Sequence, residues 1–570
     1  MECDPDASGS PLWRFLGKAL NSIKMKSADR SAHSKGRSLL SHMSEGNQSK
    51  DFDVIVIGAG INGAGVARDA AMRGLKVCVL DKADMASGTS SASTRLIHGG
   101  LRYLEHGEFG LVRESLRERE TLLKIAPHLV KPIPILIPIY KNARRGRLQL
   151  RAGMLLYDLL SYDKTLRRHR MLSRYETVQQ APGLNPDGLT GGAVYYDTQV
   201  EFAERLVLEN ILDARAHSAE VFTYARVTRI ANENGRARGV EFVWKGKSRT
   251  LQGRFVVNAA GPWVDELLQT TGNSNRLIGG TKGSHIIVAP FDGAPSMALY
   301  AEATSDRRPF FIIPWNGNYL IGTTDIHFSG DPSQARCEIS ELDYLLTETN
   351  SVLPKANLSS NDVLFTYSGV RPLPFTNQKD EQRITRRHFI RQHREMANVC
   401  SLVGGKLTTY RQLAEECVDL VFDSLNEPRP RCSTAEVELP GARKYDLLAT
   451  WFRADERFSR RVRERLLCIY GSRTDQLLKV CERNLVLLQP LNDSSDVLAG
   501  EIVFAFEQEM ATTLTDCLAR RTMSSFNADL AIGEDERAAA VAKRFLSWGD
   551  ERARHDVEDY RCYTQGLART

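Results

Sequence analysis

The sequence predicts an α/β protein, in which a Rossmann-like dinucleotide-binding domain is combined with a mixed β-sheet domain and a C-terminal all-α domain. Three observations support this fold class. A short apolar strand, a glycine loop and a helical pattern follow one another at 53–68. Apolar strand-like runs recur between 255 and 323, and charged segments with helical spacing fill 440–560. A strand followed by a helix is typical of a parallel sheet, whereas a separate run of helices indicates another domain.

The glycine loop begins where the β-branched run Val54–Ile57 ends. Three glycines follow with G-x-G-x-x-G spacing, namely Gly58, Gly60 and Gly63. They permit a tight turn, close approach of a diphosphate and close helix–strand packing, and the N-terminus of the next helix attracts the diphosphate. A second strand, Val77–Leu80, ends in Asp81, where a carboxylate binds ribose hydroxyls. The acid favours NAD or FAD over NADP.

Length and composition exclude several classes of protein. A chain of 570 residues is expected to form two or three domains. The net charge of +6 gives no reason to expect a nucleic-acid partner. The ten cysteines contain no C-x-x-C pair, so we expect no metal site and a reducing compartment. No run of eighteen apolar residues occurs, so membrane association would be peripheral.

Residues 1–50 differ from the rest of the chain. They are rich in Ser, Lys and Arg and lack a sustained apolar period, so we expect a disordered extension. The segment resembles a transit peptide only weakly, because acidic residues lie near Met1. An alternative is that translation starts at Met43.

The middle of the chain contains a small polar string at 87–105, a helical pattern at 111–126 and a proline-interrupted strand at 133–140. Basic residues then gather around the apolar helical segment Met154–Leu160. They are Lys141, Arg144, Arg145, Arg147, Arg151, Lys164, Arg167, Arg168 and Arg170. Two interpretations stay open here, a solvated basic face and a docking surface for anionic lipid.

Several later elements are predicted from their patterns. Strands are expected around a Glu233–Gly235 turn, and at 255–263, 282–289 and 310–323. A strand, glycine loop and helix recur at 401–410. Helices are expected at 457–470 and 502–520, after the proline-rich linker at 427–430.

With these motifs in view, the chain resembles the FAD-dependent glycerol-3-phosphate dehydrogenases from about residue 51 into the C-terminal domain. The resemblance rests on GAGINGAG (58–65), SSASTRLIHGGLRYLE (90–105), NAAGPW (258–263), KGSH (282–285), IGTTD (321–325), TYSGVRPL (366–373) and GGKLTTYR (404–411). It implies a Rossmann-like FAD-binding domain with an inserted mixed β-sheet substrate domain of the amino-acid-oxidase type. FAD-binding segments are expected at about 51–130, 190–275 and 366–425, substrate segments at about 131–189 and 276–365, and helices at 440–560.

The resemblance also implies an activity. Members of this family oxidise sn-glycerol 3-phosphate to dihydroxyacetone phosphate, with non-covalent FAD as hydride acceptor and membrane ubiquinone or menaquinone as electron acceptor. The expected location is the cytoplasmic face of a bacterial inner membrane, with the mitochondrial inner membrane as alternative. The absence of an EF-hand string after 440 argues against a calcium-regulated mitochondrial form. A homodimer is one possible oligomeric state.

A phosphate dianion requires arginine or lysine, since arginine binds it bidentately. The resemblance places Arg102, Arg371 and Lys406 in glycine-flanked loops near the flavin. We assign Arg371 and Arg102 to the phosphate, and Lys406 to the phosphate, the C2 oxygen or the reduced flavin. Tyr103 is expected either to hydrogen-bond the substrate or to pack.

Two histidines compete for the role of general base, a role that a neutral imidazole suits near pH 7. His285 is favoured, and His98 is expected near the flavin ring. Asp325 is expected either to orient one of these histidines or to cap a turn. Arg386 matches a family position near the site.

The flavin contacts follow from the same strings. Gly58, Gly60 and Gly63 are expected to hold the diphosphate and Asp81 the ribose. The other expected contacts are Ser90, Ser91, Gly261, Gly405, Leu407 and Thr408. For the two serines, capping of a helix is an alternative role.

Other functions remain as alternatives. A glycerol-3-phosphate oxidase would pass electrons to oxygen from the same scaffold. A noncatalytic flavin sensor would lack the basic residues that bind a substrate anion. The presence of Arg102, Arg371 and Lys406 argues against this alternative. An amine or hydroxy-acid oxidoreductase would need a more apolar pocket.

Overall fold

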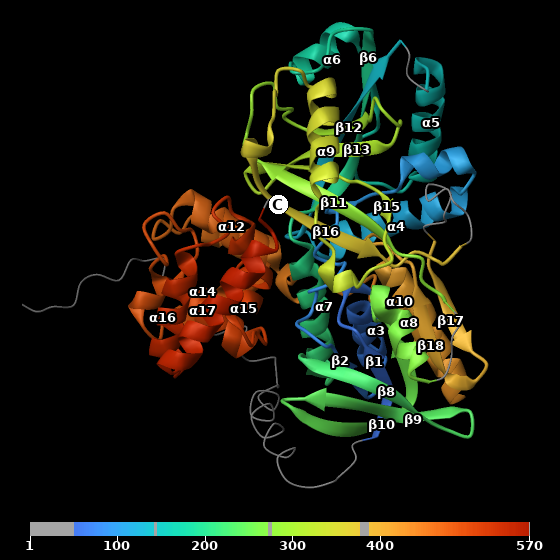
Figure 1. Cartoon of the computed structure of the whole chain (residues 1–570), viewed down its shortest axis with the longest axis vertical. Helices are drawn as coiled ribbons and strands as arrows, with labels where there is room; N and C mark the ends of the chain where they lie inside the picture. The colour runs from blue at the N-terminus through green and yellow to red at the C-terminus, as the bar shows by residue number, and fades with distance from the viewer. Residues whose placement is uncertain (1–50, 142–144, 272–275, 377–386, 569–570) are drawn as a thin grey trace, which may run out of the picture. The chain divides into compact units, whose positions relative to one another are not determined.

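The computed structural model describes residues 51–568 except 142–144, 272–275 and 377–386. The predicted disorder of 1–50 and the alternative start at Met43 lie outside the described residues. From Asp51 onward the chain forms one compact unit, built from two β-sheets with their helices and a C-terminal group of helices (Figure 1). The predicted α/β class with an all-α C-terminal domain is therefore confirmed.

The first sheet is parallel at its centre, in the order β18-β10-β1-β2-β7. These strands are β1 (Asp51–Ile57), β2 (Val77–Leu80), β7 (Glu220–Phe222), β10 (Lys247–Asn258) and β18 (Met396–Val403), with β17 (Phe389–His393) antiparallel at the edge. Val54, Val56 and Val79 are fully buried, as expected for strands covered on both faces. The helices α3 (Ile61–Met72), α7 (Ala203–Ala216) and α10 (Tyr410–Leu425) pack beside one another along this sheet.

A β-hairpin extends from the first half of β10. It consists of β8 (Ala225–Glu233) and β9 (Arg236–Trp244), in which Glu233 pairs with Arg236. Asn234 and Gly235, both with positive φ, form the two-residue turn. This confirms the turn predicted from the Asn-Gly pair.

The second sheet is mixed, in the order β15-β11-β14-β13-β12-β4-β6-β3, with β16 beside β11 and β5 beside β6. Its strands are β3 (Leu96–Ile97), β4 (Val130–Tyr140), β5 (Arg170–Ser173), β6 (Leu189–Val200), β11 (Thr281–Val288), β12 (Ala298–Glu302), β13 (Pro309–Trp315), β14 (Asn318–Gly322), β15 (Ile326–His327) and β16 (Val363–Arg371). The neighbouring helices are α4 (Phe109–Ile125), α5 (Arg147–Leu160), α6 (Arg174–Gln180) and α9 (Ile339–Val352).

The predicted FAD-binding segments 190–275 and 366–425 each begin within a strand of the second sheet, β6 or β16. Both were expected in the FAD-binding segments 190–275 and 366–425, yet both lie in the second sheet. β6 pairs with β4 along its whole length, and β16 pairs with β11. A strand belongs to the sheet of the strand with which it pairs. The composition of an apolar strand does not identify that partner.

Prolines shape β4. Pro132, Pro134 and Pro138 fall on positions of the same parity, so their missing N–H groups lie along one edge of the strand. One edge of β4 pairs with β6 throughout, whereas β12 joins it only at Ile135 and Leu136. The strand predicted here is confirmed.

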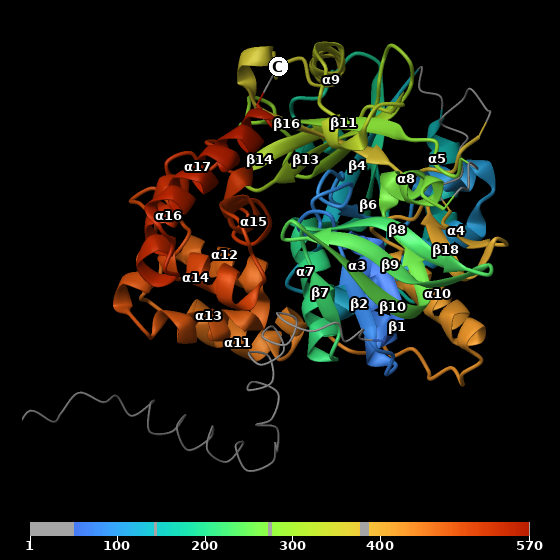
Figure 2. The ribbon, with the colours of Figure 1, turned by 60° about the horizontal axis from the view of Figure 1, so that its bottom comes forward.

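The C-terminal domain contains α11 (Tyr445–Arg453), α12 (Arg460–Tyr470), α13 (Thr474–Cys481), α14 (Ala499–Gln508), α15 (Leu514–Arg520), α16 (Glu534–Phe545) and α17 (Asp550–Gln565) (Figure 2). The single helix expected at 502–520 is wrong, because two helices occupy it. Met510 has a positive φ of 58°, and Thr513 caps α15 by accepting the N–H of Asp516 at 3.1 Å. A left-handed residue followed by a Thr cap ends one helix and begins another.

Candidate functional site

A cavity of about 400 Å³ opens at the carboxyl ends of the parallel strands. Ligands of open α/β sheets bind at this end of the strands. The predicted residues that line it are Gly58, Gly60, Asp81, Ser90, Gly261, Gly405, Lys406 and Leu407. The cavity therefore joins both glycine loops, which are about 345 residues apart in the sequence.

The first glycine loop needs its glycines for steric reasons. Gly58 has a φ of 104°, which side-chain-bearing residues rarely adopt. A Cβ atom on Gly63 would lie 1.9 Å from the carbonyl oxygen of Gly58, so any other residue would push α3 away from β1. Helix α3 begins at Ile61, and its N–H donates to Oγ of Ser90 at 2.9 Å. Ser90 thus caps this helix terminus and also lines the cavity.

Asp81 lies at the end of β2, in the wall of the cavity. Its Oδ2 accepts the N–H of Ala59 at 2.6 Å, and its Oδ1 accepts the N–H of Ala83 at 2.9 Å. Burial raises the pKa of this carboxyl to about 6, against the effect of the two N–H groups. These bonds hold the carboxylate beside the glycine loop, where a ribose is expected.

Two buried polar atoms at the cavity have no hydrogen-bond partner among the described residues, Oδ1 of Asn62 and Nζ of Lys406. Nδ2 of Asn62 donates to the carbonyl of Gly404 at 3.3 Å and so connects the two glycine loops. Unpartnered buried polar groups are costly, and they are common where a ligand binds. The residues present therefore fit a dinucleotide. Sequence reasoning missed Asn62, although it is the polar residue inside the glycine motif.

The second glycine loop contacts the segment of residues 98–103. Oγ1 of Thr408 accepts the N–H of His98 at 3.1 Å. Nζ of Lys406 lies 3.9 Å from the centre of the Tyr103 ring, as in a cation–π contact. Burial lowers the pKa of Lys406, although Tyr103 opposes the shift. Arg102 precedes Tyr103 in the short 3-10 helix Leu101–His106.

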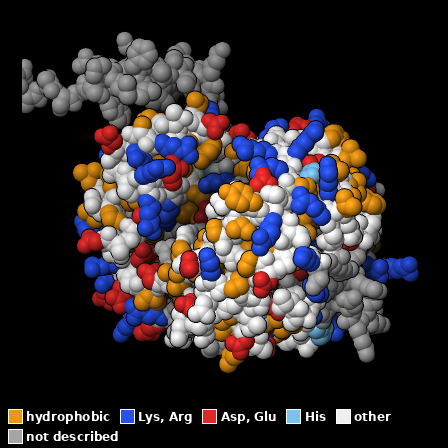
Figure 3. All heavy atoms as spheres, turned by 90° about the horizontal axis from the view of Figure 1, so that it is seen from above, with side chains coloured by type: hydrophobic (Ala, Val, Ile, Leu, Met, Phe, Trp, Pro, Cys, Tyr) orange, Lys and Arg blue, Asp and Glu red, His pale blue; other side chains and the backbone are white. Residues whose placement is uncertain are grey.

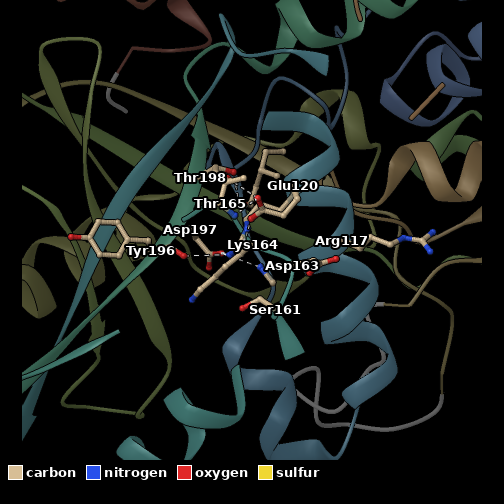
Figure 4. Close-up of polar contacts among 12 residues, drawn as sticks. Arg117, Glu120, Ser161, Asp163, Lys164, Thr165, Tyr196, Asp197 and Thr198 are labelled. Carbon is tan, nitrogen blue, oxygen red and sulfur yellow. Dashed lines mark hydrogen bonds and ion pairs between the residues drawn. The ribbon is translucent and has the colours of Figure 1, made fainter. Parts of the chain in front are cut away.

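A buried network positions this string. The N–H of Gly99 donates to the hydroxyl of Tyr157 at 3.0 Å, and that hydroxyl donates to Asp197 at 2.8 Å. Arg119 donates to the same carboxylate at 2.6 Å. Figure 4 shows Asp197 near Glu120 and Thr165, which bond each other at 2.8 Å. Sequence reasoning missed Asp197 and Tyr157, because neither belongs to a recognised motif.

Arg371 is held by the turn that follows β14. Its Nη1 lies 2.9 Å from Oδ1 of Asp325, and its Nη2 lies 2.9 Å from Oγ1 of Thr323. A Cβ atom on Gly283 would lie 2.1 Å from Nη2, so the glycine makes room for the arginine. The next residue, Pro372, lines the cavity and accepts the N–H of Gly404 at 2.9 Å. Arg371 therefore lies one residue from the cavity wall.

Asp325 was expected to orient a histidine or to cap a turn. Its carboxylate accepts from Arg371, and its backbone carbonyl accepts from Arg308 at 2.6 Å. An arginine competes successfully for a carboxylate because the charged hydrogen bond is stronger than one to a neutral imidazole.

His285 is almost fully buried, at 1 % exposure, and its ring stacks on Tyr367 with centroids 4.9 Å apart. Nε2 lies 3.0 Å from Oγ1 of Thr94, whereas Nδ1 has no hydrogen-bond partner in the described part of the chain. Burial, and then the charges of Arg371 and Arg95, hold the pKa of His285 well below its usual value.

His98 is half-buried, and burial lowers its pKa to about 4. Asp197 opposes this shift and Lys406 adds to it. Both predicted histidines are therefore neutral at pH 7, the state in which an imidazole can accept a proton.

The remaining predicted residues differ in placement. Gly261 begins the short 3-10 helix Gly261–Trp263 at the cavity wall. Oγ of Ser91 donates to the carbonyl of Gly88 at 2.9 Å; Gly88 lines the cavity, but Ser91 does not. Arg386 lies outside the described residues. Within 51–568, apart from the gaps given above, no group of three His, Cys, Asp or Glu side chains is arranged to hold a metal ion.

The fold and the cavity define an FAD-dependent oxidoreductase, and FAD is its cofactor. The family model described as FAD dependent oxidoreductase matches residues 53–420, and that of the C-terminal domain of alpha-glycerophosphate oxidase matches residues 432–553. The chain belongs to the FAD-dependent glycerol-3-phosphate dehydrogenase family.

Individual relatives agree with this membership. A glycerol-3-phosphate dehydrogenase of Synechocystis sp. is 48% identical over 83% of this chain and 89% of its own length. An aerobic glycerol-3-phosphate dehydrogenase of Staphylococcus epidermidis is 32% identical over 84% and 88%. The crystal structure of the glycerol-3-phosphate dehydrogenase from Bacillus halodurans complexed with FAD superposes with a TM-score of 0.76 at 30% identity, covering 94% of this chain and 97% of that one.

Proposed function

We propose that this protein oxidises sn-glycerol 3-phosphate to dihydroxyacetone phosphate and passes the electrons to a membrane quinone. The observation that carries the substrate assignment is Arg371, oriented by Thr323 and Asp325 one residue from the wall of the FAD cavity. Membership of the glycerol-3-phosphate dehydrogenase family supports the same substrate.

Each site residue is assigned a role that suits its chemistry. Arg371 and Arg102 bind the phosphate dianion, which a guanidinium can grip with two hydrogen bonds. Lys406, whose ammonium has no hydrogen-bond acceptor among the described residues, bonds the C2 oxygen. His285 takes the hydroxyl proton at its unpartnered Nδ1, and His98 is the alternative base. When bound, FAD supplies the acceptor for the hydride that leaves C2.

An anaerobic titration tests this function. The FAD-loaded protein is mixed with glycerol 3-phosphate, and the flavin absorbance is followed. Bleaching with one equivalent of substrate supports the proposal, whereas an unchanged spectrum contradicts it. Quinone reduction compared with peroxide release then separates a quinone acceptor from oxygen, the acceptor of an oxidase.

Helix α5 supports attachment to a membrane. Leu148, Leu155 and Leu159 are 80%, 55% and 67% exposed. They lie on one face, because their spacing of seven and four residues is close to whole turns of about 3.6 residues each. Arg147 and Arg151 are exposed on the same helix. An exposed apolar stripe beside basic side chains is typical of helices that lie in an anionic membrane surface.

Only some of the basic residues between Lys141 and Arg170 support membrane docking. Arg145 forms ion pairs with Glu105 and Glu302, and Arg144 lies outside the described residues. Figure 3 shows basic and hydrophobic side chains interspersed on the face seen from above. None of the helices that the structure describes is long and apolar enough to cross a bilayer. We therefore infer peripheral docking through α5, with the cytoplasmic face of a bacterial inner membrane as the proposed site and the mitochondrial inner membrane as alternative.

A further inference from the structure

The loop after β2 connects the FAD cavity with the C-terminal domain. Asp81, Ala86 and Ser90 line the cavity, but Asp84 points away from it and is fully buried. Oδ2 of Asp84 lies 2.6 Å from Nε of Arg520 and 2.7 Å from Nη1 of Arg521, and Oδ1 lies 2.9 Å from Nη2 of Arg521. Both arginines come from the end of α15, in the C-terminal domain (Figure 2).

These arginines are themselves fixed. Nε of Arg521 donates to the carbonyl of Glu509 at 2.8 Å, and Arg520 donates to Asp516 at 2.7 Å. Burial alone would raise the pKa of Asp84, but the two guanidinium groups lower it below its ordinary value. The carboxylate is thus charged and paired inside the protein, where breaking such a pair is far more costly than at the surface.

A second connection joins the same two parts. The hydroxyl of Tyr224 donates to Asp516 at 2.6 Å, and its backbone N–H donates to the carbonyl of Ala83 at 3.1 Å. The next N–H, of Ala225, donates to the carbonyl of Asp81 at 2.7 Å, and Ala225 lines the cavity. Asp516, Arg520 and Arg521 therefore hold both segments that form this side of the cavity.

The loop needs such support. Residues 81–90 contain no helix or strand, so no regular hydrogen-bond ladder fixes their backbone. We propose that the C-terminal helical domain sets the affinity for FAD, because Arg520 and Arg521 hold Asp84 and so keep the loop that carries Asp81 in its binding conformation. These arginines are positioning residues, since neither lines the cavity. A preorganised loop binds more tightly because less ordering entropy is lost on binding.

The test measures the FAD dissociation constant of the full-length protein by refilling apoprotein with FAD and following flavin fluorescence. R521Q is expected to raise this constant by at least about ten-fold, because it leaves a buried carboxylate half-paired. The control is R465Q, which removes an arginine whose side chain is 17% exposed and whose partner Glu501, at 2.8 Å, lies within the C-terminal domain. We expect R465Q to stay within about two-fold of the natural protein.

A milder variant keeps the test decisive if R521Q does not fold. Y224F removes only one hydroxyl, at a residue that is 37% exposed, and is expected to raise the dissociation constant a few-fold. The proposal is overturned if Y224F and every folded R521Q preparation bind FAD like the natural protein, or if R465Q weakens binding as much as R521Q. Because FAD binding is measured without substrate, the result does not depend on the proposed reaction.

Discussion

Arg371 and Asp325 form an ion pair in which Nη1 and Oδ1 lie 2.9 Å apart. The arginine is 24% exposed, and Thr323 supplies a further acceptor. Nη2 also donates to the backbone carbonyl of Thr324 at 3.3 Å, so the turn Thr323–Asp325 fixes the direction of the guanidinium. The pair therefore orients the arginine that we assign to the substrate phosphate.

Replacing Arg371 by alanine is expected to raise KM for glycerol 3-phosphate while flavin stays bound. Loss of a charge-assisted contact to phosphate costs about 2–4 kcal/mol. Steady-state kinetics and the flavin absorbance of the purified variant measure the two quantities. An unchanged KM would show that Arg371 does not bind the substrate phosphate. D325N keeps the charge of Arg371 but weakens the ion pair that orients it. The KM of D325N should therefore lie between the KM of the natural protein and that of the Arg371→Ala variant.

Replacing His285 by glutamine is expected to lower kcat by about 10²- to 10⁴-fold, the usual contribution of a general base. The same change at His98 should have a smaller effect. Because the pKa of His285 is held well below its usual value, its ring stays neutral in mildly acidic solution. The acidic limb of the rate profile should therefore lie below about pH 6.5. A larger loss at His98 would reverse the assignment.

Membrane docking depends on both parts of the α5 surface. Replacing Leu148, Leu155 and Leu159 by serine should weaken binding to vesicles that contain anionic lipid, because the stripe no longer enters the apolar layer. R147E together with R151E should weaken it more at low salt than at high salt. Cosedimentation measures both effects.

The control for docking uses two exposed leucines of the C-terminal domain, Leu447 and Leu485. Serine at these positions should leave vesicle binding unchanged. If both α5 variants also cosediment with vesicles like the natural protein, α5 is a solvated surface and not a docking site.

His128 is expected to make the fold sensitive to acid. Both ring nitrogens are buried without a partner in the described part of the chain, and burial, followed by the charges of Arg205, Lys131 and Arg473, lowers its pKa to about 3. Below the unfolded value of about 6.5, the unfolded chain binds a proton that the folded chain does not. The free energy of unfolding therefore decreases as pH falls from 6.5 towards 3.

H128L removes this titration. Leucine loses no hydrogen bond at this position, so the midpoint of thermal unfolding at pH 7.5 should change little. Between pH 7.5 and pH 5 the midpoint should fall less in the variant than in the natural protein. Equal falls would show that other groups, among them His98, account for the acid sensitivity.

Local motifs allowed the first part of the fold to be predicted. The glycine loop, the acid after β2 and the Asn-Gly hairpin each depend on a few neighbouring residues, whose steric and hydrogen-bonding needs are readable in order. The second glycine loop at Gly405 was predicted for the same reason, and it lies at the cavity with the first.

Other features depend on residues far apart in the chain. The sequence could not reveal that Asp325 bonds Arg371, since several partners were available to that carboxylate. Tyr157 and Asp197 belong to no motif, and Asn62 lies inside the glycine motif without being one of its glycines; the contacts of all three appear only when separate strands and helices meet.

The sequence by itself determined the α/β class, the FAD-binding loop and the family, because short-range backbone geometry and composition specify them. Only the tertiary structure decided which sheet receives β6, which acceptors hold Arg371 and which domain supports Asp84. Asp84 and Arg521 are 437 residues apart in sequence. Packing of the whole chain selects such partners, since many arginines compete for each buried carboxylate and only the folded geometry distinguishes them.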